Sequence, residues 1–335
     1  MTVPSGALRF NSDSRKLEYY NGEAWWQIDS FTPDSATGGA RGVFFWGYQA
    51  PLTANSNTIN YITISTTGNA IDFGDITGGA RRGGASCASS TRGLFAGGLV
   101  SPTRSNTIDF ITIASTGNSQ DFGDLLASAG RQDIAGGGAA SATRGLFAGG
   151  TEAADVNTIE YVTIASTGNA IDFGDLLSVT SLTAGCSSST RAVFGGGLSP
   201  GLTNVIQFLT ISTTGNTADF GDLLTARRSV GACSNSTRGL YGGGNAPGNS
   251  NVVEYITIAS IGNAIDFGDL TQERGTISAC SSSTRGTWAG GDIPGTNSNV
   301  IDYVTIMSTG NAVDFGDLLI VGAQLTACSN GHGGL

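Results

Sequence analysis

A motif that recurs six times is the feature that most constrains how this chain can fold. In each copy an arginine is followed by glycine, or once by alanine, and then by an apolar pair and small residues. The copies follow one another at a period of roughly 50 residues, which is typical of proteins built from repeated supersecondary units. The fold must therefore be assembled from six copies of one unit. Its six arginines are Arg41, Arg92, Arg144, Arg191, Arg238 and Arg285.

The residues between successive arginines predict four short strands in every copy. In the first copy, residues 42–45 are apolar, residues 57–64 are rich in β-branched and aromatic side chains, and residues 71–76 follow a Thr-Gly-Asn turn. A further strand precedes each arginine, as residues 231–237 do ahead of Arg238. Glycine supplies 52 residues and charged residues only 13%, which favours strands joined by tight turns over solvent-facing helices. We expect an all-β protein.

The first and last copies are incomplete in complementary ways. The first begins at Arg41 with its second strand, whereas residues 324–329 form a first strand that no arginine follows. Four-stranded units repeated around an axis make a β-propeller, and a C-terminal strand that joins the first unit leaves no unpaired edge there. The sequence therefore predicts a six-bladed β-propeller over residues 40–330, with four-stranded blades and a ring closed by the C-terminal strand. Residues 331–335 are expected to be a short tail.

The repeat resembles that of the kelch-type propeller family, in which a Gly-Gly pair follows the second strand and aromatic residues occupy the third and fourth strands. The chain departs from kelch repeats by using phenylalanine in the fourth strand, where those repeats usually carry tryptophan. The resemblance implies the fold and leaves the subfamily open. The matching pairs are Gly97-Gly98, Gly149-Gly150, Gly196-Gly197, Gly243-Gly244 and Gly290-Gly291, and the phenylalanines are Phe73, Phe122, Phe173, Phe220, Phe267 and Phe315.

Each fourth strand carries the sequence Asp-Phe-Gly-Asp, first at residues 72–75. In kinases Asp-Phe-Gly binds a metal, but it is then accompanied by a Gly-rich loop and a His-Arg-Asp loop, which this sequence lacks. A catalytic centre also needs groups of different roles that converge once, not the same group six times. We expect these aspartates to cap turns or to pair with a repeated arginine. We expect each repeated arginine to bond a carboxylate or carbonyl of its own or the adjacent blade.

The reactive side chains argue against an enzyme. The one histidine, His332, lies in a glycine-rich tail that we expect to be mobile, so a copper site or a Ser-His-Asp triad lacks its histidines. The cysteines occur once per copy, with Ala139 in their place in the third, so we expect reduced, packed thiols and neither disulfides nor a metal site. We predict no catalytic residue, no metal and no cofactor. The cysteines are Cys87, Cys186, Cys233, Cys280 and Cys328.

Residues 1–39 break the repeat. They predict a small module of two or three strands with a hairpin turn at Asn21-Gly22. Its aromatic side chains are too many to leave in water, so we expect them to pack on the propeller, on another copy or on a partner. These candidate attachment residues are Phe10, Tyr19, Tyr20, Trp25 and Trp26.

The same module resembles a short motif of bacteriophage tail and other virion proteins, of the form Gly-x-Leu-Arg-Phe-Asn-Ser followed by Leu-Glu-x-Tyr-Asn-Gly-x-x-Trp. The positions that carry the resemblance are Phe10, Tyr20, Asn21, Gly22 and Trp25. The resemblance implies a phage structural protein, made in the host cytoplasm, located in the virion and bound to other virion proteins.

The connections between second and third strands differ in every copy. In an antiparallel blade they share one face with the connections between blades, whereas both ends of the propeller lie on the opposite face. Because binding residues commonly sit on loops held by a rigid scaffold, we expect this loop face to point outward. The connections comprise residues 49–56, 99–105, 151–156, 198–203, 245–250 and 292–298.

Charge and hydropathy narrow the partners. The net charge is −10 and Lys16 is the one lysine, so no basic surface for nucleic acid is expected. No stretch approaches the roughly 20 apolar residues of a membrane span, and the first residues lack the pattern of a signal peptide.

We thus predict a non-enzymatic virion protein of the tail fibre, baseplate or capsid surface, whose loop face binds a host receptor or glycan. The alternative is a cellular kelch-type interaction propeller, and a carbohydrate-active enzyme is a distant third. Ligand, host, copy number and homo-oligomerisation stay open.

Overall fold

The computed structural model describes residues 3–11, 16–28, 40–45, 47–49, 54–134 and 139–335. The chain divides into two compact units, Met1–Gly39 and Ala40–Leu335, and the regular elements described in both are β-strands. No helix in the described part of the chain is long and apolar enough to cross a membrane.

The first unit is a three-stranded antiparallel sheet in the order β1-β2-β3. Its strands are β1 (Leu8–Asn11), β2 (Lys16–Tyr20) and β3 (Trp25–Ile28). Between β2 and β3 the Asn21 side-chain oxygen accepts hydrogen bonds from the backbone N–H groups of Glu23 and Ala24. Gly22 has a φ of 106°, which glycine adopts readily. The predicted hairpin turn at Asn21-Gly22 is confirmed.

The described residues of the second unit form six antiparallel sheets of three or four strands, five of them with four strands, and three two-stranded hairpins. We number the sheets 1 to 6 in the order of their arginines, Arg41 to Arg285. Sheet 1 consists of β32 (Thr326–Ser329), β4 (Arg41–Phe45), β7 (Thr58–Thr63) and β8 (Ile71–Asp75). Sheet 2 consists of β9 (Ala85–Ala88), β10 (Arg92–Ala96), β13 (Thr107–Thr112) and β14 (Gln120–Asp124). Sheet 3 consists of β15 (Arg144–Ala148), β16 (Thr158–Thr163) and β17 (Ile171–Asp175).

Sheets 4 to 6 follow the same order. Sheet 4 consists of β18 (Ala184–Ser187), β19 (Arg191–Ser199), β20 (Gly201–Thr210) and β21 (Ala218–Asp222). Sheet 5 consists of β22 (Gly231–Ser234), β23 (Arg238–Gly242), β24 (Ser250–Thr257) and β25 (Ile265–Arg274). Sheet 6 consists of β26 (Ser278–Ser281), β27 (Arg285–Ala289), β30 (Val300–Thr305) and β31 (Val313–Asp317). Small hairpins lie in three of the variable connections: β5 (Tyr48–Gln49) with β6 (Ala54–Asn55), β11 (Leu99–Val100) with β12 (Thr103–Arg104), and β28 (Asp292–Ile293) with β29 (Thr296–Asn297).

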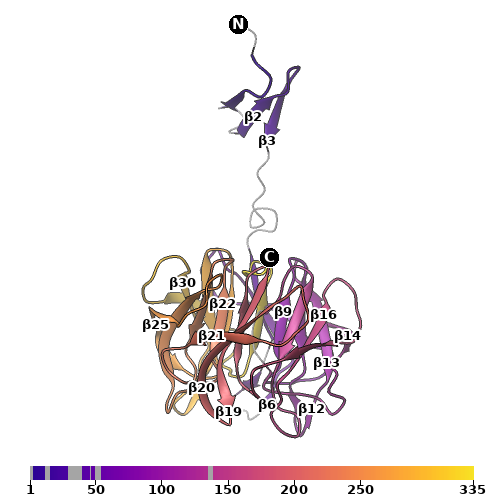
Figure 1. The fold of residues 1–335 in the computed structure, drawn as a ribbon, viewed down its shortest axis with the longest axis vertical. Helices are drawn as coiled ribbons and strands as arrows, with labels where there is room; N and C mark the ends of the chain where they lie inside the picture. Colours follow the sequence, from indigo (N-terminus) through magenta and orange to yellow (C-terminus); the bar gives the residue numbers. More distant parts are fainter. Residues whose placement is uncertain (1–2, 12–15, 29–39, 46, 50–53, 135–138) are drawn as a thin grey trace. The chain divides into compact units, whose positions relative to one another are not determined.

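Sheet 1 joins the two ends of the second unit. In it β32 pairs antiparallel with β4, so that Thr326 lies opposite Phe45 and Ser329 opposite Gly42. The predicted pairing of the last strand with the first is confirmed. Within this unit the C-terminus lies at the end opposite β6 and β12, as expected for variable connections that share the far face (Figure 1).

Of sheets 1 to 6, sheet 3 alone has three strands in the described residues. The segment expected as its first strand runs through residues 135–138, which lie outside the described residues. Directly after them, Ala140 forms an isolated bridge with Gly145, and the Ala139 carbonyl accepts a hydrogen bond from Leu146.

Aromatic pairs fill each sheet in the same way. The repeated phenylalanine of the fourth strand packs edge-on against an aromatic residue of the third, as Phe73 does against Tyr61 with ring centroids 5.8 Å apart. Edge-to-face pairs of this kind add stability beyond the apolar area that they bury. The other pairs are Phe110–Phe122, Tyr161–Phe173, Phe208–Phe220, Tyr255–Phe267 and Tyr303–Phe315.

The Gly-Asn turn of each sheet, preceded by threonine in five sheets and by Ile261 in sheet 5, binds the outermost strand of the sheet before it. Gly117 donates to the Phe73 carbonyl at 2.7 Å, and the Asn118 side chain accepts from the Asp75 N–H at 3.0 Å. A Cβ on Gly74 would meet the Gly117 backbone, and Gly74 has a φ of 145°. The repeated Asp-Phe-Gly-Asp strand is therefore the segment to which the neighbouring turn binds. These hydrogen bonds occupy the backbone groups that an edge strand otherwise exposes.

A thiol of one sheet also faces a glycine of the next. The Cys233 sulfur lies 2.8 Å from the position that a Cβ on Gly286 would occupy. The two exceptions to the repeat fall together, because Ala139 replaces the cysteine of sheet 3 and Ala192 replaces the glycine of sheet 4, and these alanines share one apolar cluster. A smaller side chain on one side is thus matched by an added methyl on the other. The remaining pairs are Cys280–Gly42, Cys328–Gly93, Cys87–Gly145 and Cys186–Gly239.

The compensation of side-chain size between Ala139 and Ala192 can be tested by reproducing it at the Cys233–Gly286 contact. Gly286→Ala is expected to lower the free energy of unfolding by about 1–3 kcal/mol, the usual cost of overpacking a core. Adding Cys233→Ala recreates the Ala139/Ala192 pair and should recover most of that loss. Urea denaturation of the two single variants and the double variant measures it, and a double variant as unstable as Gly286→Ala would show that the thiol is not the obstacle.

Candidate functional site

The six repeated arginines bind main-chain carbonyls of the next sheet. Arg41 donates to the carbonyl of Ile113 at 2.9 Å, and Arg285 of sheet 6 donates to those of Ile64 and Ser65 in sheet 1, each at 3.1 Å. We predicted a carboxylate or carbonyl of the same or the adjacent unit as the partner, and the structure shows carbonyls of the next sheet. The other pairs are Arg92 with Ile164 and Ala165, Arg144 with Ile211, Arg191 with Ile258 and Ala259, and Arg238 with Ile306.

Each of these guanidinium groups also lies over the third-strand aromatic ring of its own sheet. Arg41 is 4.8 Å from the centroid of Tyr61, and the other five distances run from 4.4 to 4.7 Å. Carbonyl and ring together fix the guanidinium, and a cation held over a ring face gains further electrostatic energy. The repeated arginines therefore join neighbouring sheets.

The role expected for the repeated aspartates was wrong. Among the described residues, the carboxylates of the Asp-Phe-Gly-Asp sequences form no hydrogen bond or ion pair, and the first aspartate of each is exposed. The reason is the position of the strand: on the outermost strand the side chain of Asp72 points into water. The capping is done by asparagine, such as Asn118, from the neighbouring turn.

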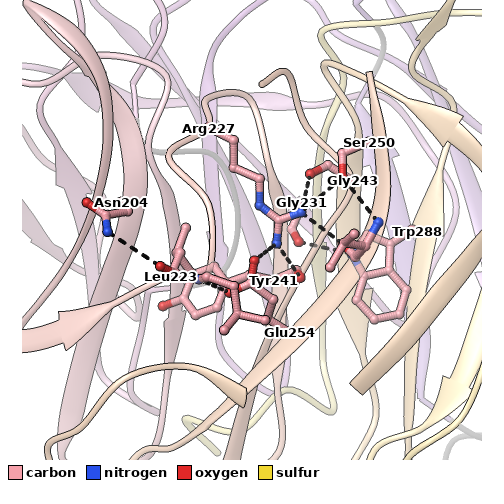
Figure 2. Close-up of polar contacts among 11 residues, drawn as sticks. Asn204, Leu223, Arg227, Gly231, Tyr241, Gly243, Ser250, Glu254 and Trp288 are labelled. Atoms are coloured by element: carbon pink, nitrogen blue, oxygen red, sulfur yellow. Dashed lines mark hydrogen bonds and ion pairs between the residues drawn. The ribbon is translucent and has the colours of Figure 1, made fainter. Parts of the chain in front are cut away.

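Buried ion pairs at other positions were not foreseen. Arg227 lies in the connection that leads into sheet 5, and its Nη2 donates to the Glu254 carboxylate at 2.5 Å while Nη1 donates to the carbonyls of Gly243 and Val252 (Figure 2). Both side chains are almost fully buried. The equivalent pairs are Arg81–Asp109, Arg131–Glu160 and Arg274–Asp302.

Burial opposes the charge of both partners in these pairs. It raises the pKa of Glu160 and Glu254 and lowers that of Arg227 and Arg274, while the opposite charge acts in the other direction. The pKa of Arg81 falls to about 10 by burial. At this pKa the Arg81 guanidinium is still protonated at neutral pH.

The sheets without such an arginine also lack the acid. Thr180 and Gln207 occupy the two positions for sheet 4, and Gly322 and Asn60 occupy them for sheet 1. The Gln207 side-chain oxygen accepts from the Leu177 N–H at 2.8 Å, as the Glu254 carboxylate does from Leu224 at 2.7 Å. The charge is lost from both partners together, because a lone buried charge is strongly destabilising. These pairs are part of the scaffold.

The five cysteines are buried and unbridged, as predicted. Burial raises the pKa of Cys87, Cys186 and Cys280 to about 12, so these thiols stay protonated and unreactive at neutral pH. In the described residues, no three His, Cys, Asp or Glu side chains gather so as to hold a metal.

The expectation of a mobile tail at His332 was wrong. His332 is 7% exposed, its Nε2 donates to the Ala88 carbonyl at 2.8 Å, and its Nδ1 accepts the Gly334 N–H at 3.1 Å. Burial lowers its pKa, which keeps the ring neutral. In neighbouring first strands a serine hydroxyl makes the equivalent bond, as Ser187 does to the Ala140 carbonyl at 2.8 Å. Sheet 3 has Ala140 at the serine position, and His332 supplies the missing donor.

The N-terminal sheet gathers three of its five candidate aromatics on one face. Cross-strand pairing aligns Leu8 with Tyr19 and Tyr19 with Trp26, and Phe10 lies on the same face because strand residues alternate. Within the unit, Leu8 is 62% exposed, Tyr19 40%, Trp26 56% and Phe10 67%. We call them the apolar face. Leu8 was not among the predicted attachment residues.

The other two aromatics lie on the opposite face and contact each other. The Tyr20 and Trp25 ring centroids are 5.3 Å apart, and the guanidinium of Arg9 lies 4.1 Å above the Trp25 ring. Arg9 also pairs with the buried Glu18 at 2.8 Å. Trp25 and Trp26 thus have different roles, since one stabilises the module and the other lies in the open.

On the loop face, one backbone bridge recurs in all six sheets. Tyr48 and Ala323 exchange two N–H to carbonyl hydrogen bonds of 2.8 and 3.0 Å between the variable connection and the connection that leads into the sheet. We call these twelve residues the rim. The backbone hydrogen bonds of the rim are the same in all six sheets, whereas its side chains differ. The fold therefore does not require particular side chains at these positions. The other pairs are Leu99–Arg82, Thr151–Gln132, Leu198–Ser181, Asn245–Arg228 and Asp292–Gly275.

Inside the rim, each connection bends through one residue of positive φ. Thr276, at 44°, is a β-branched residue for which this conformation costs energy. These six residues surround a cavity of about 60 Å³ to which every sheet contributes. They are Gly83, Asp133, Leu182, Ser229, Thr276 and Gln324.

No protein family matches the sequence, and no curated protein matches it either. The fold and the two candidate surfaces, the apolar face and the rim, are what the chain offers for assigning a function.

Proposed function

We propose that residues 40–330 form a closed, six-bladed β-propeller of kelch-like type. The support is that sheet 6 contacts sheet 1 as every other sheet contacts the next. Gly68 donates to the Phe315 carbonyl at 2.8 Å, and Asn69 accepts from the Asp317 N–H at 3.1 Å. Each sheet is then a blade, and the small cavity inside the rim lies on the axis.

We propose that the protein is a non-enzymatic structural component of a bacteriophage virion, in the tail fibre, baseplate or capsid surface. The observation that carries this proposal is the apolar face of the N-terminal sheet, on the segment that resembles a virion protein motif. Leu8, Phe10, Tyr19 and Trp26 form a contiguous cross-strand patch, and large aromatic side chains dominate the centres of protein interfaces. This face docks on another virion protein, and the propeller presents its rim to the host surface.

The alternative is a cellular protein-interaction propeller that uses the same rim. It accounts for the repeats equally well but assigns no role to the apolar face. The two readings differ in where the protein is found, so attachment to particles separates them.

Replacing the apolar face should remove the protein from particles without unfolding it. We expect Phe10→Ser with Trp26→Ser to reduce incorporation at least tenfold, because each side chain is more than half exposed in the module and contributes little to its fold. The measurement is the amount of protein in purified virions after complementation, with circular dichroism to verify β structure.

The matched control is Ile171→Ser, which replaces a 57% exposed apolar residue on the outermost strand of sheet 3. It should incorporate normally. Full incorporation of the double variant, or of a chain lacking residues 1–35, would contradict docking by this module. Absence of the wild-type protein from virions would contradict the virion role altogether.

A further inference from the structure

Two hollows on the loop face meet at Tyr48 and Arg82. One, of about 480 Å³, is lined by both residues together with Asn55, Val100 and Ser101. The other, of about 260 Å³, is lined by both together with Thr276, Asp292, Asn297 and Gln324. The first volume lies within the range of roughly 300–1,000 Å³ found for small-molecule sites.

The hollows form one groove that leads toward the axis. Thr276 and Gln324 line both the second hollow and the small cavity inside the rim. The groove therefore crosses sheets 2, 1 and 6. The inner cavity, at about 60 Å³, holds a substituent and not a ring.

The walls of the groove are fixed by amide side chains that tie the loops together. Asn297 donates to the Tyr48 carbonyl at 3.0 Å, and Asn55 donates to the Leu99 carbonyl at 2.8 Å. Tyr48 is also held by its two bonds to Ala323. A groove with a fixed backbone loses little conformational entropy when a ligand binds.

Tyr48 is distinctive among the rim residues. Among the described residues of the rim and the connections that carry it, no other aromatic side chain is present. Leucine stands at the equivalent position in sheets 2 and 4, so the bridge does not require a ring. Tyr48 is partly buried, and the exposed part of its side chain combines a flat apolar ring with a polar tip, which suits the C–H face of a sugar ring.

Arg82 supplies the charge. Its guanidinium lies 4.7 Å from the Tyr48 ring centroid. Burial raises the pKa of the Asp133 carboxyl and the charge of Arg82 opposes that rise, but the Arg82 side chain forms no hydrogen bond or close ion pair with another described residue. The preceding Arg81 differs, since it is fully buried against Asp109. The planar fork of Arg82 is therefore available to a carboxylate, which it can bind with two parallel hydrogen bonds.

The surrounding charge limits how acidic the ligand can be. Asp292 lines the same groove, and the chain carries a net charge of −10. Repulsion grows with the charge of the ligand, so a doubly charged phosphate or a dense polyanion is disfavoured relative to an isolated carboxylate.

We propose that the Tyr48–Arg82 groove binds a short oligosaccharide that contains a uronic acid, with the sugar ring against Tyr48 and its carboxylate on Arg82. This assignment rests on the proposed function, in which the rim faces the host surface, and names the ligand class of that same surface.

The test uses the full-length protein and a trigalacturonate probe, with the methyl ester of the same trisaccharide as the uncharged comparison. Isothermal titration calorimetry should show binding of the acid and at least tenfold weaker binding of the ester. Arg82→Ala and Tyr48→Leu should each raise the Kd at least tenfold. Arg228→Ala, a rim arginine outside the groove, should leave the Kd unchanged.

Each other result overturns a part of the proposal. No binding of the acid at millimolar concentration rejects the ligand class, and equal binding of the ester rejects the role of the charge. Loss of binding in Arg228→Ala but not in Arg82→Ala places the site elsewhere. Virion incorporation of Arg82→Ala, measured alongside, should stay normal, so a failure of the groove is distinguishable from a failure of the virion role.

Discussion

Removal of residues 324–335 is expected to abolish the folded, monodisperse protein. The deletion takes away β32, and with it the hydrogen bonds to β4, the Cys328 thiol that packs against Gly93, and the Ser329 hydroxyl that bonds the Ser281 carbonyl at 2.5 Å. A whole edge of β4 is then unpaired, which favours aggregation. Size-exclusion chromatography should show aggregates or no soluble protein.

Two further chains make this result specific. Deleting residues 331–335 alone removes His332 but keeps β32, and this protein should stay monodisperse. Moving residues 324–330 ahead of Ala40 with a one-residue link should restore folding to the deleted chain, because Asn330 and Arg41 already exchange hydrogen bonds of a tight turn. A soluble, monodisperse protein without residues 324–335 would contradict the proposed closure of the propeller by this strand.

The second large effect is expected at the buried ion pair of sheet 5. Arg227→Thr leaves the Glu254 carboxylate buried without its partner, and such a loss typically costs about 3–5 kcal/mol of the free energy of unfolding. Threonine is chosen because sheet 4 carries it at this position, as Thr180. Urea denaturation at neutral pH measures the loss.

The second site of the pair provides the control. Adding Glu254→Gln to Arg227→Thr reproduces the Thr180/Gln207 pair of sheet 4, in which the amide oxygen still accepts the backbone N–H. The double variant should recover most of the stability, because removing both charges leaves no unpaired ion. A double variant no more stable than Arg227→Thr would mean that the pair acts through packing and not through charge.

The repeat made much of the fold predictable. Six arginines, the Thr-Gly-Asn turns and the complementary ends gave the strands, their order within a sheet and the pairing of residues 326–329 with residues 42–45. These features depend on short-range sequence patterns or on the length of the repeat, so they can be recognised in a single sequence. Repetition also indicated that each arginine has the same kind of partner, but it left open whether that partner is a carboxylate or a carbonyl, and in which unit.

What lay between sheets was harder to predict. The buried pairs join residues about half a repeat apart, and sequence motifs do not show which strands face each other. A signal was nevertheless present, because Thr180 and Gln207 lose their charge together, as Gly322 and Asn60 do. The exchange of Ala139 with Ala192 carries a similar signal for volume.

The candidate site was the least predictable part. Trp25 and Trp26 are adjacent in sequence, and only the strand register shows that they lie on opposite faces of the module. His332 was misjudged because glycines around it suggested freedom, whereas Gly333 and Gly334 lie so close to the Asn235, Ser187 and Ala140 carbonyls that a side chain would not fit.

The exposed aspartates of the outermost strands bear on how copies behave when crowded. Each sheet carries one such carboxylate beside an edge whose backbone groups already bind the next turn. At physiological salt these charges repel over roughly 8 Å, a distance that matters only when two outer surfaces nearly touch. Approach of two copies along these strands is therefore opposed by charge, and it meets edge backbone groups that are already hydrogen-bonded to the next turn.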